Sequence, residues 1–360
     1  MLTIACYTSK RRKSQRRSQN RRPGVNVSAM RTNPSHPYDQ LTPDVIVAAV
    51  EKAGFRSDGR LLPLNSYENR VYQVGIEDAA PIIAKFYRPD RWSTPAILEE
   101  HAFAHELAAE EIPIVAPLRR DGESLFEYQG FRIALYPRQG GHWPELATRQ
   151  DREWMGRFLG RIHVVGRRRA FTQRGRLTVK QFGAQARDFL LKHDFIPEHL
   201  LAAYESVSAD LLERIEDHFA QAEGDVTRLR LHGDCHPGNI LWTDRGPHFV
   251  DLDDCLMGPA IQDIWMLLSG TRAEMEEQLT HLLAGYAQFA TFNFRELALI
   301  ENLRALRIMH YAAWLARRWS DPAFPKAFPW FAETRYWEQH VLALREQLAA
   351  VDEHPLAIVD

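Results

Sequence analysis

The stretch Leu231–Asp254, LHGDCHPGNILWTDRGPHFVDLDD, decides the fold of the 360-residue chain. It begins with a segment interrupted by glycine and proline that carries Asp234 and, five residues later, Asn239. Two short apolar runs follow, separated by a four-residue turn sequence, and the second run delivers Asp251. The pattern predicts a polar loop followed by a β-hairpin. A hairpin of this length would bring Asp234, Asn239 and Asp251 around one point.

These three residues form the arrangement with which kinases assemble a base and its metal ligands. Phosphoryl transfer needs a carboxylate that orients and deprotonates the acceptor hydroxyl, and Asp234 is the candidate. Mg²⁺ prefers oxygen ligands, so Asn239 and Asp251 are predicted to hold it, which makes Asp251 a second catalytic residue. We expect His232 to brace the loop through a hydrogen bond. The alternative is a polar loop built from ordinary turn-forming residues.

Lys85 lies inside the apolar run 82–87, IIAKFY, which reads as a strand. A buried ammonium group needs an anionic partner. In a nucleotide site those partners are phosphate and a helix glutamate. The following helix, expected over residues 93–110, offers Glu99 and Glu100, and we favour Glu100 because it continues the apolar face of that helix. The alternative for Lys85 is a side chain that reaches solvent from an edge strand.

The turn at residues 65–69, NSYEN, stands where a phosphate-covering turn is required, although the chain has no G-x-G-x-x-G motif there. Ser66 and Asn69 tolerate turn geometry, and backbone N–H groups can bind phosphate without glycine. We therefore expect this turn to cover the nucleotide.

The order of elements predicts an α+β protein with two lobes and a protein-kinase-like fold. Up to residue 137 the patterns are mostly strands, and after Gly141 they are mostly helices. We expect an antiparallel β-sheet N-lobe with one embedded helix over residues 36–137, a helical C-lobe over 138–345 and a tail over 346–360. The expected strands are 61–74 with its turn, 82–87, 112–117, 124–128 and 130–136. The expected helices are 44–53, 93–110, 151–163, 180–193, 196–222, 263–268, 272–290 and 295–319.

Composition indicates a soluble protein, with 45% hydrophobic and 26% charged residues. No apolar run approaches the ~18 residues that a membrane span needs. The three cysteines lack a C-x-x-C spacing, so we expect a reducing, cytoplasmic compartment. We also expect a monomer.

Charge is distributed unevenly along the chain. Residues 1–31 hold nine Lys and Arg and no Asp or Glu. The rest of the chain therefore has 36 of the 45 basic residues and all 47 acidic ones, which gives it a net charge of −11. We interpret residues 1–35 as a disordered basic extension, with nucleic-acid binding as the less favoured reading. An acidic C-lobe would suit a cationic acceptor.

The HGDCHPGN and VDLDD stretches resemble the aminoglycoside phosphotransferase/choline kinase branch of the protein-kinase-like fold. Further stretches, among them PLNSYENRVYQ, ILEEH and DPAFPK, resemble bacterial stress-response kinases of that branch over residues 38–335. The resemblance implies ATP- and Mg²⁺-dependent phosphorylation of Ser and Thr on protein in the cytoplasm. It also implies that Ser66 lies over ATP, that Lys85 pairs with its phosphates, that Asp234 accepts the proton, and that Asn239 and Asp251 bind Mg²⁺.

The chain departs from eukaryotic-type kinases at several points. His236 stands two residues after Asp234, where Ser/Thr kinases carry Lys, and neither D-F-G nor A-P-E is present. Two alternatives stay open, the first of them because of these departures. One is a phosphotransferase for a small hydroxylated molecule of the amino alcohol or aminoglycoside type. The other is a nucleotide-binding regulatory module without transfer activity.

Overall fold

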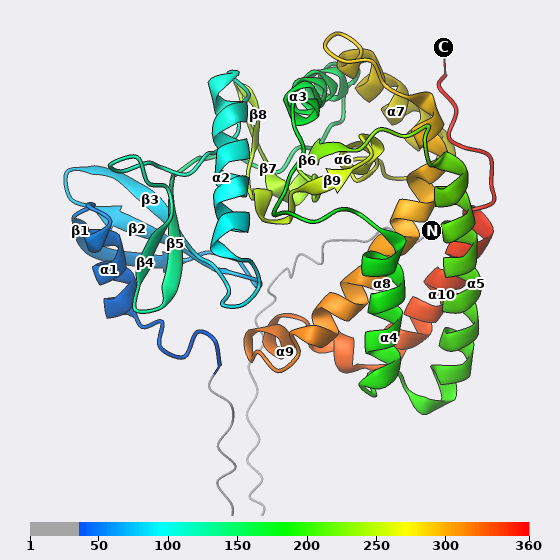
Figure 1. The fold of residues 1–360 in the computed structure, drawn as a ribbon, viewed down its shortest axis with the longest axis horizontal. Helices are drawn as coiled ribbons and strands as arrows, with labels where there is room; N and C mark the ends of the chain where they lie inside the picture. Colours follow the sequence, from blue (N-terminus) through cyan, green and yellow to red (C-terminus); the bar gives the residue numbers. More distant parts are fainter. Residues whose placement is uncertain (1–35, 360) are drawn as a thin grey trace, which may run out of the picture.

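The computed structural model describes residues 36–359, so the basic extension over residues 1–35 lies outside the described part of the chain. Figure 1 shows two lobes: a sheet with its helices on the left and a larger, mainly helical body on the right. Each lobe has its own main apolar core. The predicted α+β, two-lobed fold is thereby confirmed.

The N-lobe sheet is antiparallel and has the strand order β1-β2-β3-β5-β4. In β3, Lys85 faces Val71 of β2 on one side and Ala134 of β5 on the other. Lys85 therefore lies on the central strand, and the edge-strand reading does not apply. The strands are β1 (Ser57–Pro63), β2 (Arg70–Ile76), β3 (Ala79–Phe86), β4 (Phe126–Tyr128) and β5 (Phe131–Pro137).

Two helices belong to this lobe. The helix α1 (Pro43–Lys52) begins after Thr42, whose hydroxyl accepts the N–H of Val45, and its apolar side packs on the sheet. The helix α2 (Thr94–Ala109) begins after the N-cap Ser93 and is the helix expected to carry the Lys85 partner. Both helices lie at the expected ranges, 44–53 and 93–110, and α1 lies at the outer edge of the lobe (Figure 1).

The predicted strand over residues 112–117 is wrong. This segment is an extended linker that makes one isolated parallel bridge, Ile114 to Phe249, with the C-lobe hairpin. The N–H of Val115 donates to the Phe249 carbonyl at 2.9 Å, and the N–H of Phe249 donates to Pro113 at 2.8 Å. Pro113 and Pro117 have no N–H, so the segment cannot continue a ladder. It fastens the N-lobe to the C-lobe instead.

The C-lobe is built on long helices that pack around the catalytic segment. The helices α3 (Arg149–Arg167) and α7 (Arg272–Tyr286) approach each other closely at Gly156. A Cβ at this position would lie only 1.9 Å from the Leu282 carbonyl oxygen. The remaining helices are α4 (Gln185–Lys192), α5 (Glu198–Ala222), α6 (Ile261–Trp265), α8 (Ile300–Arg317), α9 (Ala323–Ala327) and α10 (Thr334–Ala350).

The helix α10 is not among the elements that the sequence predicted. It packs against α5 and α8 and continues to Ala350, past the tail boundary placed at residue 345. Beyond it, Leu356 is buried, so the end of the chain also packs on this lobe. Within residues 36–359, no helix is both long and apolar enough to cross a membrane.

Candidate active site

The catalytic segment runs between β6 (Leu229–Leu231) and β7 (Ile240–Thr243), and β7 pairs with β8 (Gly246–Phe249) as the predicted hairpin. Gly233 has a φ of +85°, and a Cβ there would lie 2.3 Å from the carbonyl oxygen of Asp254. Only glycine fits this close approach. It lets the catalytic loop lie directly against the segment that carries Asp251, Asp253 and Asp254.

A buried carboxylate, Asp263, holds this loop in place. It accepts the backbone N–H groups of His232 and Gly233, both at 2.8 Å, and lies 3.2 Å from Nε2 of the buried His163. His163 is therefore a packed residue. The predicted brace is present as well, since Nε2 of His232 lies 2.9 Å from the Val250 carbonyl. The role of Asp263 was not predicted.

Asp234 is flanked by two basic side chains. Its Oδ1 accepts from Nη1 of Arg307 at 2.6 Å, and its Oδ2 lies 3.4 Å from Nε2 of His236. Asn239 donates to Oδ2 of Asp234 at 3.3 Å. Burial alone would raise the pKa of Asp234, but Arg307 and His236 outweigh burial and lower it. Asp234 is therefore ionised and oriented.

Asn239 and Asp251 lie close together and offer side-chain oxygens that can bind a metal ion. The N–H of Val250 donates to the Asn239 carbonyl at 3.0 Å, which sets the residue before Asp251 beside Asn239. The amide of Asn239 donates through Nδ2 to the Asp234 carbonyl at 3.0 Å, and no described residue bonds to its Oδ1. Asp251 has the left-handed backbone φ of 60° and ψ of 69°, and its carboxylate is half exposed.

This donor set fits a divalent cation such as Mg²⁺, which takes one or two protein oxygens and completes its shell with phosphate and water. Residues 36–359 contain no group of three or more His, Cys, Asp or Glu side chains arranged to hold a metal by themselves. A metal here would therefore depend on the nucleotide for part of its coordination.

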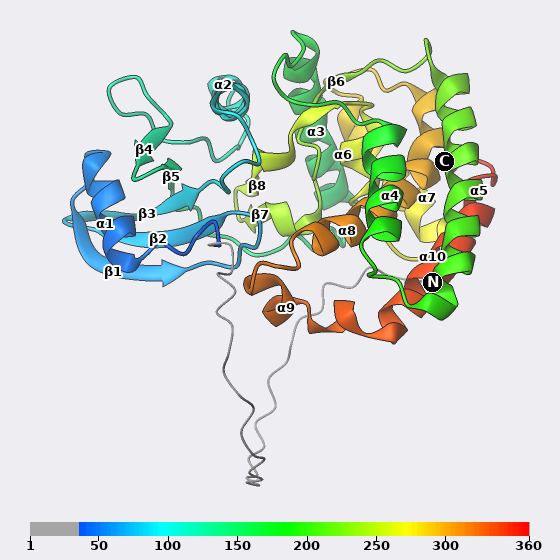
Figure 2. The same ribbon diagram turned by 60° about the horizontal axis from the view of Figure 1, so that its bottom comes forward.

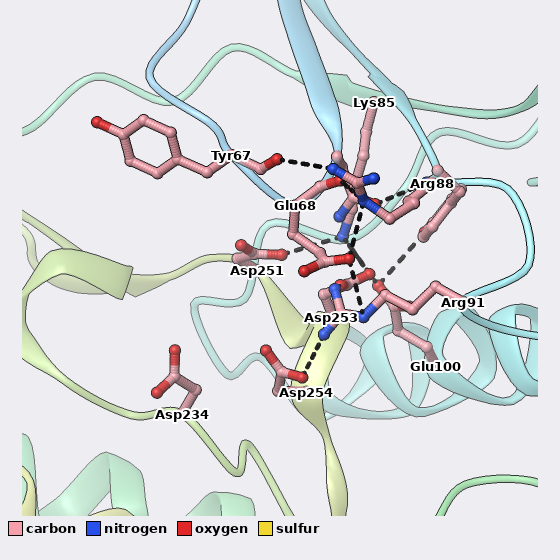
Figure 3. A network of polar contacts seen from close by, with 12 residues as sticks. Tyr67, Glu68, Lys85, Arg88, Arg91, Glu100, Asp234, Asp251, Asp253 and Asp254 are labelled. Atoms are coloured by element: carbon pink, nitrogen blue, oxygen red, sulfur yellow. Dashed lines mark hydrogen bonds and ion pairs between the residues drawn. The ribbon is translucent and has the colours of Figure 1, made fainter. Parts of the chain in front are cut away.

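The buried ammonium of Lys85 meets three carboxylates, and Figure 3 shows them converging on it. Nζ lies 3.0 Å from Asp251, 3.0 Å from Asp253 and 3.6 Å from Glu100. Burial would lower the pKa of Lys85, but these acids raise it well above its usual value. Lys85 is thus charged and already sits where an anionic ligand is expected.

Glu99 points elsewhere. Its carboxylate accepts the backbone N–H groups of Thr172, Gln173 and Arg174 at 2.7 to 2.8 Å. Glu100 therefore faces Lys85, and Glu99 fastens α2 to a C-lobe loop.

Asp253 is buried between Lys85 and Arg91. Arg91 also reaches Asp254 at 2.5 Å. Burial would raise the pKa of Asp253, but Arg91 and Lys85 lower it. The carboxylate is therefore committed to these two cations.

The turn between β1 and β2 lies over this cluster. Ser66 closes the turn, because its Oγ accepts the N–H of Val71 at 3.1 Å. Glu68 reaches into the C-lobe and accepts from Nε1 of Trp314 at 2.6 Å and from Nη2 of Arg318 at 2.9 Å. The turn is thus held down by α8.

A second contact between the lobes lies beside the first. Asp321 pairs with Arg70 at 3.0 Å and with Arg88 at 2.5 Å. The Tyr67 ring packs against Phe328, with centroids 4.7 Å apart. In Figure 2, α8 and α9 lie on the side of the C-lobe that faces the sheet.

The sequence did not identify Arg307, Glu68, Asp263 or Asp321 as parts of this site. For Arg307, Glu68 and Asp321 no local signal exists, because their partners lie 73 to 251 residues away in the chain. Asp263 opens a short apolar helical segment, where it resembles an ordinary N-terminal acid.

Known proteins resemble this chain over most of its length. Residues 60–300 match the model of the phosphotransferase enzyme family. Stress response kinase A of Escherichia coli K12 is 44% identical over 326 residues, which cover 91% of this chain and 98% of that protein. The serine/threonine protein kinase RdoA of Salmonella typhimurium is 44% identical over 321 residues, which cover 89% and 97% of the two chains.

The solved structure of amicoumacin kinase in complex with AMP-PNP, Ca²⁺ and Ami has a similar fold. It superposes with a TM-score of 0.66 at 19% identity, covering 89% of this chain and 96% of that one. At this identity the likeness concerns the fold.

Proposed function

The chain belongs to the phosphotransferase enzyme family, and we propose that it is an ATP- and Mg²⁺-dependent kinase that phosphorylates Ser and Thr hydroxyls of protein. The observation that carries this proposal is the meeting of Lys85, Asp251 and the Asp234–Asn239 loop at one site between the lobes. These residues supply a cation for phosphates, oxygen ligands for a metal and a base for an acceptor.

In this proposal each residue has one task. The acceptor oxygen forms the new bond to the γ-phosphorus as the bond to ADP breaks, and Asp234 orients the hydroxyl and takes its proton. Asn239 and Asp251 hold Mg²⁺, which when bound neutralises phosphate charge. Lys85, positioned by Glu100, binds the phosphates. The turn with Ser66 covers the nucleotide through its backbone N–H groups.

The protein acceptor is supported by the names of the two relatives, a stress response kinase and a serine/threonine protein kinase. The amicoumacin kinase structure supports the alternative, a small hydroxylated acceptor. A regulatory module without transfer is disfavoured, because such a module needs no oriented, ionised Asp234. A reducing cytoplasmic location is consistent with the free, buried thiols of Cys235 and Cys255.

The test is transfer of labelled γ-phosphate from Mg·ATP, with wild type beside Asp234→Asn. A generic protein substrate and a panel of amino alcohols and aminoglycosides are offered separately. Label on protein Ser or Thr that the variant abolishes is the expected result. Label on small molecules alone would move the assignment to the metabolite kinases. ATP binding without any transfer would favour the regulatory module.

A further inference from the structure

Arg307 of α8 contacts Asp234 through one nitrogen of its guanidinium, and its side chain is about one third exposed. Its Nη1 donates to Asp234 at 2.6 Å. Within the described part of the chain, Nε and Nη2 make no hydrogen bond, and no second acid pairs with this side chain. A guanidinium carries five donors arranged to grip a carboxylate or phosphate. Arg307 is therefore under-used by the protein itself.

Arg317, ten residues further along α8, has no carboxylate partner among residues 36–359. It donates to the Gln185 carbonyl at 3.0 Å and lies over the Phe189 ring at 5.0 Å. Burial and the neighbouring charge of Arg318 lower the pKa of Arg317. This positive charge is partly withdrawn from water and lacks an anion.

Arg317 lines a cavity of about 240 Å³ between the lobes. Arg88, Arg91 and Arg318 line it too, with two acids, Asp90 and Asp321. Asp321 is already bound by Arg70 and Arg88. Arg88, Arg91 and Arg318 are paired as well, with Glu68, Asp253 and Asp254, so among the described residues Arg317 is the arginine of this lining without an acid.

Arg307 and Arg317 lie on the same helix, α8, with His310 between them in the sequence. Burial lowers the pKa of the partly buried His310 to about 4, and Arg317, Arg307 and Arg91 act in the same direction. Asp234 is near enough to act in the opposite direction. Nδ1 of His310 is buried without a hydrogen-bond partner among described residues. Arg307 and Arg317 thus lie near the same side chain as Asp234.

We propose that the acceptor side of this site binds an acidic protein segment, in which Asp or Glu residues close to the target Ser or Thr pair with Arg317 and Arg307. The inference rests on the proposed function and adds the charge of its acceptor. Carboxylates match the guanidinium geometry and supply the missing anions. The same cations repel an amino alcohol or aminoglycoside. Net charge favoured a cationic acceptor, but the side chain with unused donors beside Asp234 is an arginine, Arg307.

The experiment uses two synthetic peptides that each contain one Ser and differ only in the charge around it. Four Glu residues flank the Ser in the acidic peptide, and four Lys residues flank it in the lysine peptide. For the full-length wild type we expect kcat/KM to favour the acidic peptide at least about tenfold, the size of one charged hydrogen bond. Arg317→Gln should remove most of that preference by raising KM for the acidic peptide, with KM for ATP unchanged. Arg345→Gln, on the exposed side of α10, is the matched control and should change nothing. Equal melting temperatures of the two variants show that both are folded.

A binding measurement separates this inference from the proposed function. Fluorescence anisotropy follows a labelled acidic peptide in which Ala replaces the Ser. Salt-sensitive binding that Arg317→Gln weakens supports the inference even if neither serine peptide is phosphorylated, an outcome that contradicts only the protein-kinase proposal. No binding, or an equal or greater preference for the lysine peptide, overturns it. A rise in KM for ATP that is equal with both peptides assigns the cations to the nucleotide and also overturns it.

Discussion

Glu68, in the turn between β1 and β2, accepts a hydrogen bond at 2.9 Å from Arg318, which lies 250 residues later at the end of α8. The contact joins the two lobes across the mouth of the site (Figure 3 shows the Glu68 end). Arg88 lies 3.1 Å from the same carboxylate. Because we propose that this turn covers the phosphates, we expect nucleotide exchange to require this ion pair to open.

Glu68→Gln should speed nucleotide release. The change keeps the shape but removes the charge that Arg318 and Arg88 share, and a hydrogen bond to a charged group is worth about 1.5 to 3 kcal/mol. We expect a fluorescent ATP analogue to dissociate about tenfold faster in stopped-flow measurements. Glu77→Gln is the control, because Glu77 forms an exposed surface pair with Arg56. Equal release rates in wild type and Glu68→Gln would show that the turn is not held by this contact.

Asp234→Asn and Asp251→Asn should separate binding from chemistry. Asp251→Asn removes the proposed metal ligand, so calorimetry should show ATP binding weakened about tenfold or more with Mg²⁺ and little changed with EDTA. Asp234→Asn should bind Mg·ATP normally while kcat falls about 10²- to 10⁴-fold, the usual contribution of a general base. Normal Mg·ATP binding by Asp251→Asn would remove Asp251 from the metal site.

Lys85→Met should cost stability as well as nucleotide binding. It leaves Glu100, Asp251 and Asp253 without their shared cation, and breaking a buried ion pair costs about 3 to 5 kcal/mol. Urea unfolding measures the loss. The double variant Lys85→Met/Glu100→Gln should recover part of it, because one buried charge is removed. Lys192→Met, at an exposed position, is the control, and a Lys85→Met protein as stable as that control would contradict the network.

The contribution of Glu296 to the free energy of unfolding should fall as the pH rises. Burial raises its pKa to about 7, although its Oε2 accepts the N–H of Ile261 at 2.9 Å. A group whose pKa is higher in the folded state contributes its stability below the unfolded pKa of about 4.3 and loses it towards pH 7. Between pH 5 and pH 8, the free energy of unfolding of the wild type should therefore fall by about 2 to 3 kcal/mol relative to that of Glu296→Gln. Chemical unfolding at both values measures it, and parallel pH profiles would contradict the raised pKa.

Much of the site was predictable because its signals are local. The five-residue step from Asp234 to Asn239 and the hairpin that delivers Asp251 depend on turn residues and short strands, which neighbouring residues determine. Lys85 stood out as one charge in an apolar strand. The prediction of a strand over residues 112–117 was wrong for a related reason. Its apolar residues have the pattern of a strand, but its prolines prevent a ladder of backbone hydrogen bonds.

The sequence by itself determined the two-lobed order of elements, the catalytic loop and the need of Lys85 for an anion. Tertiary structure alone decided how Glu99 and Glu100 divide their tasks, which arginine reaches Asp234 and which helix holds the β1–β2 turn. The reason is physical. Loop and hairpin geometry follow from backbone preferences over a few residues, whereas a long charged side chain can meet any of several partners. The packing of α2 and α8 against the rest of the molecule selects among them.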